Sequence, residues 1–387
     1  MSISKPHIGI FGKMNVGKST IFNLLAAQDI AIVDSTPGTT TDIVKKVIEL
    51  QGIGPVVLID TGGIDDKTLV GERRVQRALD SINLVDMAIL VFAGNDFTEY
   101  EHTLMETFIR KKVPFFIVHN KEDQQTMSIG ITGVDVIKFS AKNPDVTLLL
   151  KAIKKIIPLD SAPENILQGV AEKNDILFLV MPQDAAAPAG RLILPQVQTI
   201  RAAIDMDAIA VCVNEKELPV ILQKCPSPKL VITDSQIFPQ VAQILEPEIP
   251  LTSFSVLLAR SRGKFRAMIK GTRTINSLQD GDNILILESC THTVDKCLDI
   301  GRTKLPNIIK NFTGKKLNFD VVAGLDALPG NLSKYKLAVQ CGGCMVTQTQ
   351  LQNRLEIAME HNVPITNYGM TLAYCAGIFD RVIKPLL

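Results

Sequence analysis

Three cysteines and one histidine in the last third of the chain are spaced so that they could bind a soft metal or an iron–sulfur cluster. Cys290 and His292 are one residue apart, and Cys341 and Cys344, some fifty positions later, are separated by two glycines. The glycines let the backbone approach a bound centre closely, so that both sulfurs can face it. Thiolate and imidazole are the ligands that zinc and iron–sulfur clusters prefer.

Three chemistries fit this spacing. A structural Zn²⁺ would take the three cysteines, with His292 or Cys297 as its fourth ligand. An iron–sulfur cluster would take the same three thiolates, with a weak or exchangeable fourth ligand. A redox-active pair would use Cys341 and Cys344 alone. The other cysteines, Cys212, Cys225 and Cys375, are expected to be buried as small hydrophobic residues.

The first third of the chain carries a phosphate-binding motif. Residues 12–19, Gly-Lys-Met-Asn-Val-Gly-Lys-Ser, match G-x4-G-K-[ST] between a predicted strand at 7–11 and a predicted helix at 19–27. In such a loop, backbone N–H groups and the helix N-terminus hold phosphate, the lysine adds charge and the serine binds Mg²⁺. The motif predicts nucleotide binding by Gly12, Asn15, Val16, Gly17, Lys18, Ser19 and Thr20.

Two further segments are typical of a hydrolytic switch. Asp60-Thr-Gly-Gly63 ends a predicted strand, where a carboxylate behind Mg²⁺ and a glycine that senses the γ-phosphate belong. Thr39 and Thr40 lie in a segment suited to a mobile lid. We expect Lys18, Gly63 and one of these two threonines to take part in hydrolysis.

Two more segments indicate that the base is guanine. Asn120, Lys121 and Asp123 follow a predicted strand, and an aspartate there can accept two hydrogen bonds that guanine donates and adenine does not. Ser140, Ala141 and Lys142 follow the next strand and can lie behind the base. GTP is therefore the expected nucleotide.

The composition points to a packed protein of more than one domain. The chain has 387 residues, 46% of them hydrophobic, and a formal net charge of +1. No apolar run approaches the roughly 20 residues that span a bilayer, and no signal peptide is recognisable. We expect a cytoplasmic protein without a membrane or nucleic-acid partner, whose seven cysteines are reduced or bind metal.

Alternating apolar strands and helices predict an α/β fold with mostly parallel sheets. The expected organisation is a P-loop GTPase domain at 1–160, a linker at 161–174, a small α/β domain at 175–265 and an α/β metal-cluster domain at 271–387. In the last of these, predicted strands at 284–287 and 336–339 end just before Cys290 and Cys341. If those strands are parallel neighbours, the cysteines share one crevice at the carboxyl edge of the sheet.

The first 160 residues resemble the translation-factor-like GTPases, in particular the Era and TrmE branch. Ile64 stands after Gly63, and an aliphatic side chain cannot orient the attacking water, so hydrolysis needs another polarising group. Asn15 matches the position that binds K⁺ in TrmE-like enzymes. The resemblance implies that K⁺ supplies this charge and that Thr40, rather than Thr39, contacts Mg²⁺.

The whole chain resembles the FeFe-hydrogenase maturation GTPase family, HydF. That family has Cys-x-His followed, some fifty residues later, by His-Cys-x-x-Cys, and the segment 190–199 also looks like it. One departure is clear, because Gln340 stands in place of the second histidine. The fourth iron position is then open to His292, Cys297, Asp295 or a solvent-derived ligand.

The resemblance implies a scaffold or carrier that holds a 4Fe–4S cluster and delivers a diiron precursor to apo FeFe-hydrogenase. It also implies the radical-SAM maturases HydE and HydG as partners, a homodimer formed by the middle domain, and slow GTP hydrolysis with Mg²⁺. Because the GTPase and cluster domains are joined, we expect hydrolysis to bias the domain arrangement and partner release. Two alternatives stay open. One is a TrmE/Era-like GTPase of tRNA or ribosome maturation with structural zinc, and the other is a GTPase switched by oxidation of Cys341 and Cys344.

Overall fold

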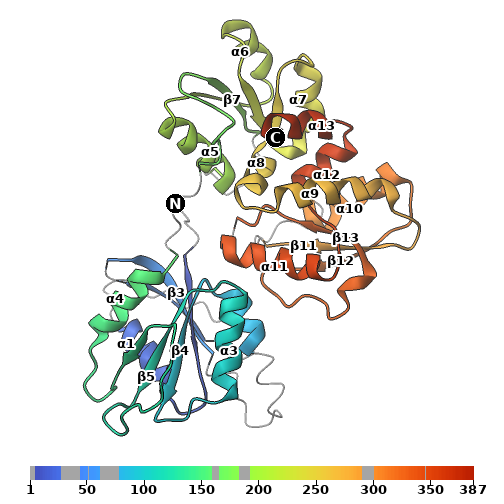
Figure 1. Ribbon diagram of the computed structural model, residues 1–387. Coiled ribbons are helices and arrows are strands. Elements are labelled where there is room, and N and C mark those ends of the chain that lie inside the picture. The colour runs from blue at the N-terminus through green and yellow to red at the C-terminus, as the bar shows by residue number, and fades with distance from the viewer. Residues whose placement is uncertain are drawn as a thin grey trace. The chain divides into compact units, whose positions relative to one another are not determined.

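The computed structural model describes residues 5–27, 44–50, 52–61, 78–158, 165–182, 192–289, 300–344 and 346–387. The chain divides into two compact units, Met1–Ser161 and Ala162–Leu387 (Figure 1). Each unit has its own sheets and its own buried apolar residues.

The first unit is built on a six-stranded sheet that is parallel except at one edge. Its strand order is β2-β3-β1-β4-β5-β6, and the β2–β3 pair is antiparallel. Strand β4, at the centre, is a continuous apolar run that is almost wholly buried, as expected for a sheet covered on both faces. The strands are β1 (His7–Phe11), β2 (Val44–Leu50), β3 (Gly54–Asp60), β4 (Met87–Ala93), β5 (Phe115–Asn120) and β6 (Val136–Lys138).

Helices lie on both faces of this sheet. Buried side chains of α1 (Lys18–Ala26) and α4 (Val146–Ile156) belong to one apolar cluster, and those of α3 (Glu99–Arg110) belong to another. This arrangement leaves the carboxyl ends of the parallel strands free for the loops that carry the nucleotide motifs. The predicted α/β class of the first domain is confirmed.

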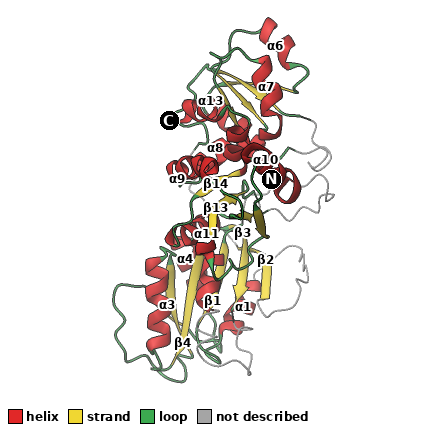
Figure 2. Ribbon diagram, turned by 90° about the vertical axis from the view of Figure 1, so that its right-hand side faces the viewer, coloured by secondary structure: helices red, strands yellow, loops and turns green. Residues whose placement is uncertain are grey.

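The second unit contains two four-stranded sheets, and every strand pair in them is parallel. The first has the order β10-β9-β7-β8 and the second the order β12-β11-β13-β14. Their strands are β7 (Ile176–Val180), β8 (Ile209–Val213), β9 (Leu230–Thr233), β10 (Leu251–Ser253), β11 (Asn283–Leu287), β12 (Asn318–Val322), β13 (Tyr335–Gln340) and β14 (Ile365–Asn367). In Figure 2 the strands of each unit are yellow and its helices red.

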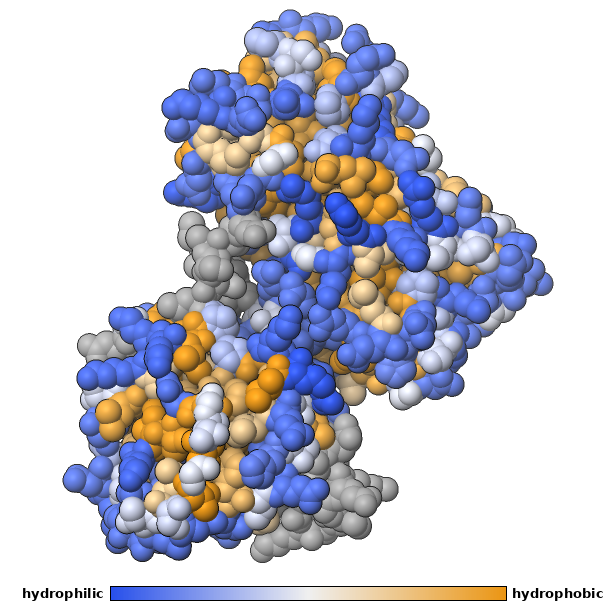
Figure 3. All heavy atoms as spheres, in the orientation of Figure 1, coloured by the Kyte–Doolittle hydropathy of each residue, from blue (hydrophilic) through white to orange (hydrophobic). Residues whose placement is uncertain are grey.

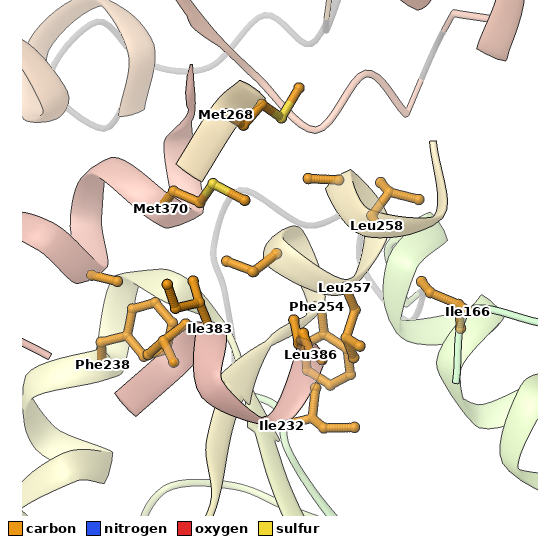
Figure 4. Close-up of a cluster of buried hydrophobic side chains, with 14 of the residues drawn as sticks. Ile166, Ile232, Phe238, Phe254, Leu257, Leu258, Met268, Met370, Ile383 and Leu386 are labelled. Atoms are coloured by element: carbon orange, nitrogen blue, oxygen red, sulfur yellow. The ribbon is translucent and has the colours of Figure 1, made fainter. Parts of the chain in front are cut away.

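The two sheets of this unit share one apolar core (Figure 4). Phe238, which follows the first sheet's strand β9, and Met370, near strand β14 of the second, belong to the same buried cluster. Helices connect and cover both sheets: α5 (Leu194–Asp205), α6 (Leu218–Lys224), α7 (Phe238–Ile244), α8 (Phe254–Ser261), α9 (Phe265–Thr272), α10 (Leu305–Thr313), α11 (Gln348–Glu360), α12 (Tyr368–Cys375) and α13 (Phe379–Ile383). None of the helices within the described ranges combines the length and apolarity that crossing a bilayer requires.

Strand β8 lies at the edge of its sheet and exposes apolar residues. Ile209 is 50% exposed and Cys212 is also exposed. The prediction that Cys212 is buried is therefore wrong, because no further strand covers β8 in the described part of the chain. Cys225 and Cys375 are half-buried. On the face shown in Figure 3, apolar residues gather in patches among hydrophilic ones.

Candidate functional site

The phosphate loop joins the end of β1 to the start of α1, and two glycines fix its path. Gly12 has a φ of 138°, and a Cβ there would lie 2.1 Å from the carbonyl oxygen of Val91. Gly17 has a φ of 99°, and its Cβ would lie 2.1 Å from Nδ2 of Asn120. At both positions a side chain would collide with its neighbours, and the positive φ is one that other residues rarely adopt, so both positions require glycine.

Lys18 and the first turn of α1 place positive charge at this loop. Lys18 is buried, and its Nζ donates to the carbonyl oxygens of Gly12 at 2.8 Å and Lys13 at 2.6 Å. The N-cap residue of α1 is Gly17, so no side chain caps the N–H groups at the helix start. A helix N-terminus beside a lysine suits a phosphate group.

Ser19 and Asp60 bring oxygen ligands to the same edge of the sheet. The hydroxyl of Ser19, in α1, donates to Oδ2 of Asp60, the last residue of β3, at 2.8 Å. Asp60 is 6% exposed. A hydroxyl and a carboxylate beside a phosphate loop are hard oxygen donors of the kind Mg²⁺ binds.

The proposed base-recognition residues are hydrogen-bonded to the phosphate loop. Asn120, at the end of β5, donates from Nδ2 to the carbonyl oxygen of Val16 at 2.8 Å. Lys121 donates from Nζ to the carbonyl oxygen of Asn15 at 2.7 Å. The structure therefore brings together two motifs that are a hundred positions apart in the sequence.

The carboxylate of Asp123 is held by the segment behind it. Its Oδ1 accepts a hydrogen bond of 2.6 Å from the hydroxyl of Ser140, and its Oδ2 lies 3.2 Å from Nζ of Lys142. The hydrogen bond from Ser140 is the main cause that keeps the pKa of Asp123 below its usual range, and Lys142 adds to it. Ala141 lies between these two partners. The side chain is thus ionised, as an acceptor of guanine N–H groups must be.

The buried His119 and the half-buried Glu122 form a pair that the sequence motifs do not identify. His119 is fully buried, its Nε2 lies 2.8 Å from the carbonyl oxygen of Gly94, and its Nδ1 contacts a carboxylate oxygen of Glu122. Glu122 also lies 3.4 Å from Nζ of Lys138. Burial opposes ionisation of Glu122, but its hydrogen bond with His119 and the charge of Lys138 lower its pKa overall. The only hint of this pair in the sequence was that His119 and Glu122 stand close to Asn120, one before it and one after it.

Several predicted residues of the nucleotide site cannot be placed. Thr39, Thr40 and Gly63 lie outside the described residues, so of the three residues predicted for hydrolysis only Lys18 is described. Thr20 lies on the exposed side of α1.

The condition for a shared edge at the thiol site is met, because β11 and β13 are parallel neighbours. Leu287 pairs with Gln340, and the backbone N–H of Cys341 donates to the carbonyl oxygen of Leu287 at 2.9 Å. Ser289, the residue before Cys290, therefore lies at the same carboxyl edge as Cys341. Cys290, His292, Asp295 and Cys297 themselves lie outside the described residues.

Cys341 is surrounded by N–H donors. It is 5% exposed, and its Sγ accepts from the backbone N–H of Ser289 at 3.0 Å and from that of Gly343 at 3.4 Å. The side-chain amide of Gln340 also lies 3.6 Å from this sulfur. Donors aimed at a sulfur stabilise negative charge on it and tune the potential of a cluster that it ligates.

Cys344 is a protonated thiol at neutral pH. Burial, followed by the nearby Cys341, raises its pKa to about 11, while Arg262 acts in the opposite direction. A metal ion binding there would displace this proton, because thiolate is the ligating form. Within the described ranges no three His, Cys, Asp or Glu side chains form a group that could hold a metal ion.

Gln340 faces its own loop. Its Nε2 donates to the hydroxyl of Ser289 at 3.0 Å and to the carbonyl oxygen of Cys341 at 3.1 Å. Its Oε1 is buried and has no hydrogen-bond partner among the described residues. An orphaned buried oxygen beside Cys341 fits a site where a further group binds.

Three family models match the chain. The Hydrogen maturase F dimerization domain matches residues 166–263, and the Hydrogen maturase F tetramerization domain matches residues 266–385. The two models belong to one family and together match more than half of the chain. A 50S ribosome-binding GTPase model matches residues 7–121.

Similar curated proteins are tRNA modification GTPases named MnmE. The protein from Alkaliphilus oremlandii is 31% identical over 206 residues, 52% of this chain and 44% of its own length. That from Baumannia cicadellinicola is 38% identical over 169 residues, 41% of this chain and 37% of its own length. The chain thus spans less than half the length of these relatives.

Two solved structures show some similarity to parts of the chain. Aquifex aeolicus Era, bound to GDP and AlF4⁻, has a TM-score of 0.32 at 16% identity, covering 62% of this chain and 98% of Era. The G domain of the FeoB iron transporter from T. maritima has a TM-score of 0.31 at 20% identity, covering 39% and 98%. Scores of this size do not establish a shared arrangement of the whole chain.

Proposed function

Because the chain belongs to the hydrogen maturase F family, a family of hydrogenase-maturation GTPases, we propose that it is a scaffold or carrier for assembly of the FeFe-hydrogenase active site. In this proposal the second unit holds a 4Fe–4S cluster and a diiron precursor, and delivers the precursor to apo-hydrogenase. The radical-SAM maturases HydE and HydG would supply the precursor. The observation that carries the proposal is the shared sheet edge of Ser289 and Cys341, which gives a thiol with two backbone N–H donors.

The first unit is a GTPase domain, and its described residues suit guanine nucleotide binding. Lys18 would offer charge to the outer phosphates, Ser19 and Asp60 would hold Mg²⁺, and Asp123 would accept hydrogen bonds from guanine. With Ile64 unable to orient water, we propose that K⁺ near Asn15 assists hydrolysis, with Thr40 and Gly63 completing the site.

Cys290, Cys341 and Cys344 would ligate the cluster. A bound cluster would supply an iron with an exchangeable position, to which a precursor can attach. The chain's own residues orient the sulfurs: Ser289 and Gly343 direct N–H groups at Cys341. Gln340, whose amide nitrogen is engaged by its own loop, leaves the fourth position to His292, Cys297, Asp295 or a solvent-derived ligand.

Iron and sulfide reconstitution tests this assignment. Wild-type protein reconstituted anaerobically and reduced with dithionite should show the EPR signal of a 4Fe–4S cluster. A Cys341→Ala/Cys344→Ala variant should lose it, while a Cys212→Ala/Cys375→Ala variant should keep it. Wild type without a cluster, or an undiminished signal in the first variant, would reject the proposal.

Metal analysis separates the alternatives. One zinc per chain without visible absorbance would favour a structural site, as in a GTPase of tRNA or ribosome maturation. GTP hydrolysis that responds to thiol oxidation in metal-free protein would favour a redox switch. The relatives named for tRNA modification match only part of the chain, whereas the two maturase models match its second unit.

GTP hydrolysis would act on partner release. Loss of the γ-phosphate removes contacts that order switch segments in GTPases, here residues 39–42 and 60–64. Binding of apo-hydrogenase should then differ between the protein loaded with a non-hydrolysable GTP analogue and the protein loaded with GDP. Equal affinities and equal release rates in surface-binding measurements would reject this coupling.

A further inference from the structure

Two buried arginines contact the backbone around the cysteine loop. Arg262, the residue after α8, is 8% exposed, and its Nη1 donates to the carbonyl oxygen of Gly343 at 2.5 Å. The same nitrogen lies 3.4 Å from the carbonyl oxygen of Gly342. Arg262 belongs to the part of the chain matched by the dimerization model, so it reaches into the loop from the neighbouring sheet's segment.

Arg354, from α11, contacts the ends of two strands at the same sheet edge. It is 6% exposed, and its guanidinium donates to the carbonyl oxygens of Val322 at 3.1 Å and of Gly324. Nη1 also lies 3.5 Å from the carbonyl oxygen of Glu288, which follows β11. These carbonyls mark the carboxyl ends of β12 and β11, so the guanidinium lies at the sheet edge that carries Cys341.

The surroundings of Arg354 contain little negative charge to balance it. No carboxylate among the described residues forms a salt bridge with it, and the nearby Glu288 is paired with Arg302 at 2.9 Å. Burial lowers the pKa of Arg354, and the neighbouring Cys341, Asp326 and Tyr368 counteract that effect. A guanidinium nevertheless remains protonated, so the edge carries a fixed cation.

A cation buried in this way costs several kcal/mol unless a negative group lies near it. The N–H donors around Cys341 point to the same conclusion, because they also favour negative charge at the sulfur. Hydrogen bonds to backbone carbonyl oxygens could be made equally well by an uncharged donor, so they do not explain why charged guanidinium groups are buried here. The combination indicates that the sheet edge at Cys341 is preorganised for a negatively charged group.

We propose that Arg262 and Arg354 make the sheet edge and cysteine loop around Cys341 selective for an anionic metal–sulfur centre and favour its reduced form. The inference deepens the proposed function and rests on it. When a one-electron reductant such as dithionite reduces a thiolate-bound cluster, one electron is added and no bond is broken. The centre becomes more negative by one charge, and two fixed cations beside it stabilise that state.

The midpoint potential of the reconstituted cluster tests the inference. In Arg354→Met and in Arg262→Met, the ratio of reduced to oxidised cluster at a fixed potential should fall at least tenfold, equivalent to about 59 mV for one electron. Arg354→Lys, which keeps the charge and alters the hydrogen bonds, should change the ratio less than threefold. Arg273→Gln is the matched control, since Arg273 is exposed and pairs with the exposed Asp380.

The outcomes separate the two claims. Methionine variants that hold wild-type iron and show the wild-type potential would overturn the inference alone. A wild-type protein that binds no iron would overturn the proposed function and the inference together. If a methionine variant does not fold, as judged by circular dichroism, Arg354→Lys decides: a tenfold shift there would show that geometry rather than charge matters.

Discussion

The side-chain amide of Asn120 donates a hydrogen bond of 2.8 Å to the backbone carbonyl oxygen of Val16. Gly17 packs closely against this contact, because a Cβ on it would be 2.1 Å from the amide nitrogen of Asn120. The end of β5 and the phosphate loop are therefore interlocked. The hydrogen bond between Asn120 and Val16 fixes the distance between the segment expected to bind the base and the loop expected to bind the phosphates. Nucleotide binding should therefore depend on it.

Gly17→Ala should weaken nucleotide binding strongly. The new methyl group would collide with Asn120, and alanine at a φ of 99° is strained by roughly 1–2 kcal/mol before any collision is counted. Affinity for a fluorescent GDP analogue should fall at least about tenfold, which corresponds to about 1.4 kcal/mol. Gly130→Ala is the control, since a Cβ there meets nothing within 4 Å. Equal affinities for the two variants would show that the interlock is unimportant.

Ser140→Ala should make GDP binding more sensitive to acid. The hydroxyl of Ser140 is the main cause of the lowered pKa of Asp123, so its removal raises that pKa toward the ordinary aspartate value. Guanine needs the carboxylate form, and affinity is therefore full above the pKa of Asp123 and lost as the pH falls through it. In the variant, this loss should begin at a higher pH than in wild type. Calorimetric titrations between about pH 3.5 and 7 measure it, around the reference value of aspartate. Superimposable pH profiles for variant and wild type would contradict the assignment.

The sequence patterns predicted strands and motifs that depend on a few neighbouring residues. They did not predict features that depend on packing between segments far apart in the chain. Strands with continuous apolar runs, such as β4, and the motifs at their ends were predicted, because a buried parallel strand leaves a clear pattern. The antiparallel edge strand β2 was missed, since Val44-Lys-Lys-Val-Ile-Glu-Leu mixes charged and apolar residues. The contact of Arg262 with Gly343 joins residues 81 positions apart and has no sequence signature.

The candidate site divides in the same way. A shared edge for the two cysteine segments depended on the strands before them being parallel neighbours, and β11 and β13 are paired in this way. Cys290 itself lies outside the described residues. The exposure of Cys212 did not follow, because an edge strand and a central strand have the same apolar composition. The match to a tetramerization domain was likewise not foreseen, since assembly depends on surface shape.

Potassium should accelerate GTP hydrolysis if Asn15 helps to hold it. Asn15 has a φ of 60° and its carbonyl oxygen accepts from Lys121, so its backbone is fixed beside the phosphate loop. Rates in K⁺ should exceed rates in Na⁺ at equal ionic strength, by about tenfold for 1.4 kcal/mol of transition-state stabilisation. Asn15→Ala should remove most of the difference without abolishing GDP binding. Equal rates in both salts, or unchanged stimulation in the variant, would reject a role for K⁺.

A charged residue on the edge strand β8 should disrupt self-association. Ile209 is 50% exposed on an edge that no strand of the described residues covers, within the segment that matches the dimerization model. Lysine at such an edge opposes pairing with another strand. Ile209→Lys should lower the molar mass measured by light scattering relative to wild type. Val220→Lys, on α6 and also 50% exposed, is the control and should not change it. A mass unchanged by Ile209→Lys would place the interface elsewhere.

Gly343→Ala should loosen the cysteine loop, whereas Gly342→Ala should not. Gly343 has a φ of 68°, and a Cβ on it would lie 3.0 Å from Nη1 of Arg262 and 3.2 Å from Leu351. The nearest atoms to a Cβ on Gly342 are 3.7 Å away, which is ordinary contact. The free energy of unfolding of the metal-free protein should therefore fall by about 1–2 kcal/mol for Gly343→Ala and by less than about 0.5 kcal/mol for Gly342→Ala. Denaturant titrations measure this difference.

In reconstituted protein, release of iron to a chelator should be faster for Gly343→Ala only, because the displaced guanidinium no longer holds the loop that carries both sulfurs. Identical release rates for the two variants would show that Arg262 does not position this loop.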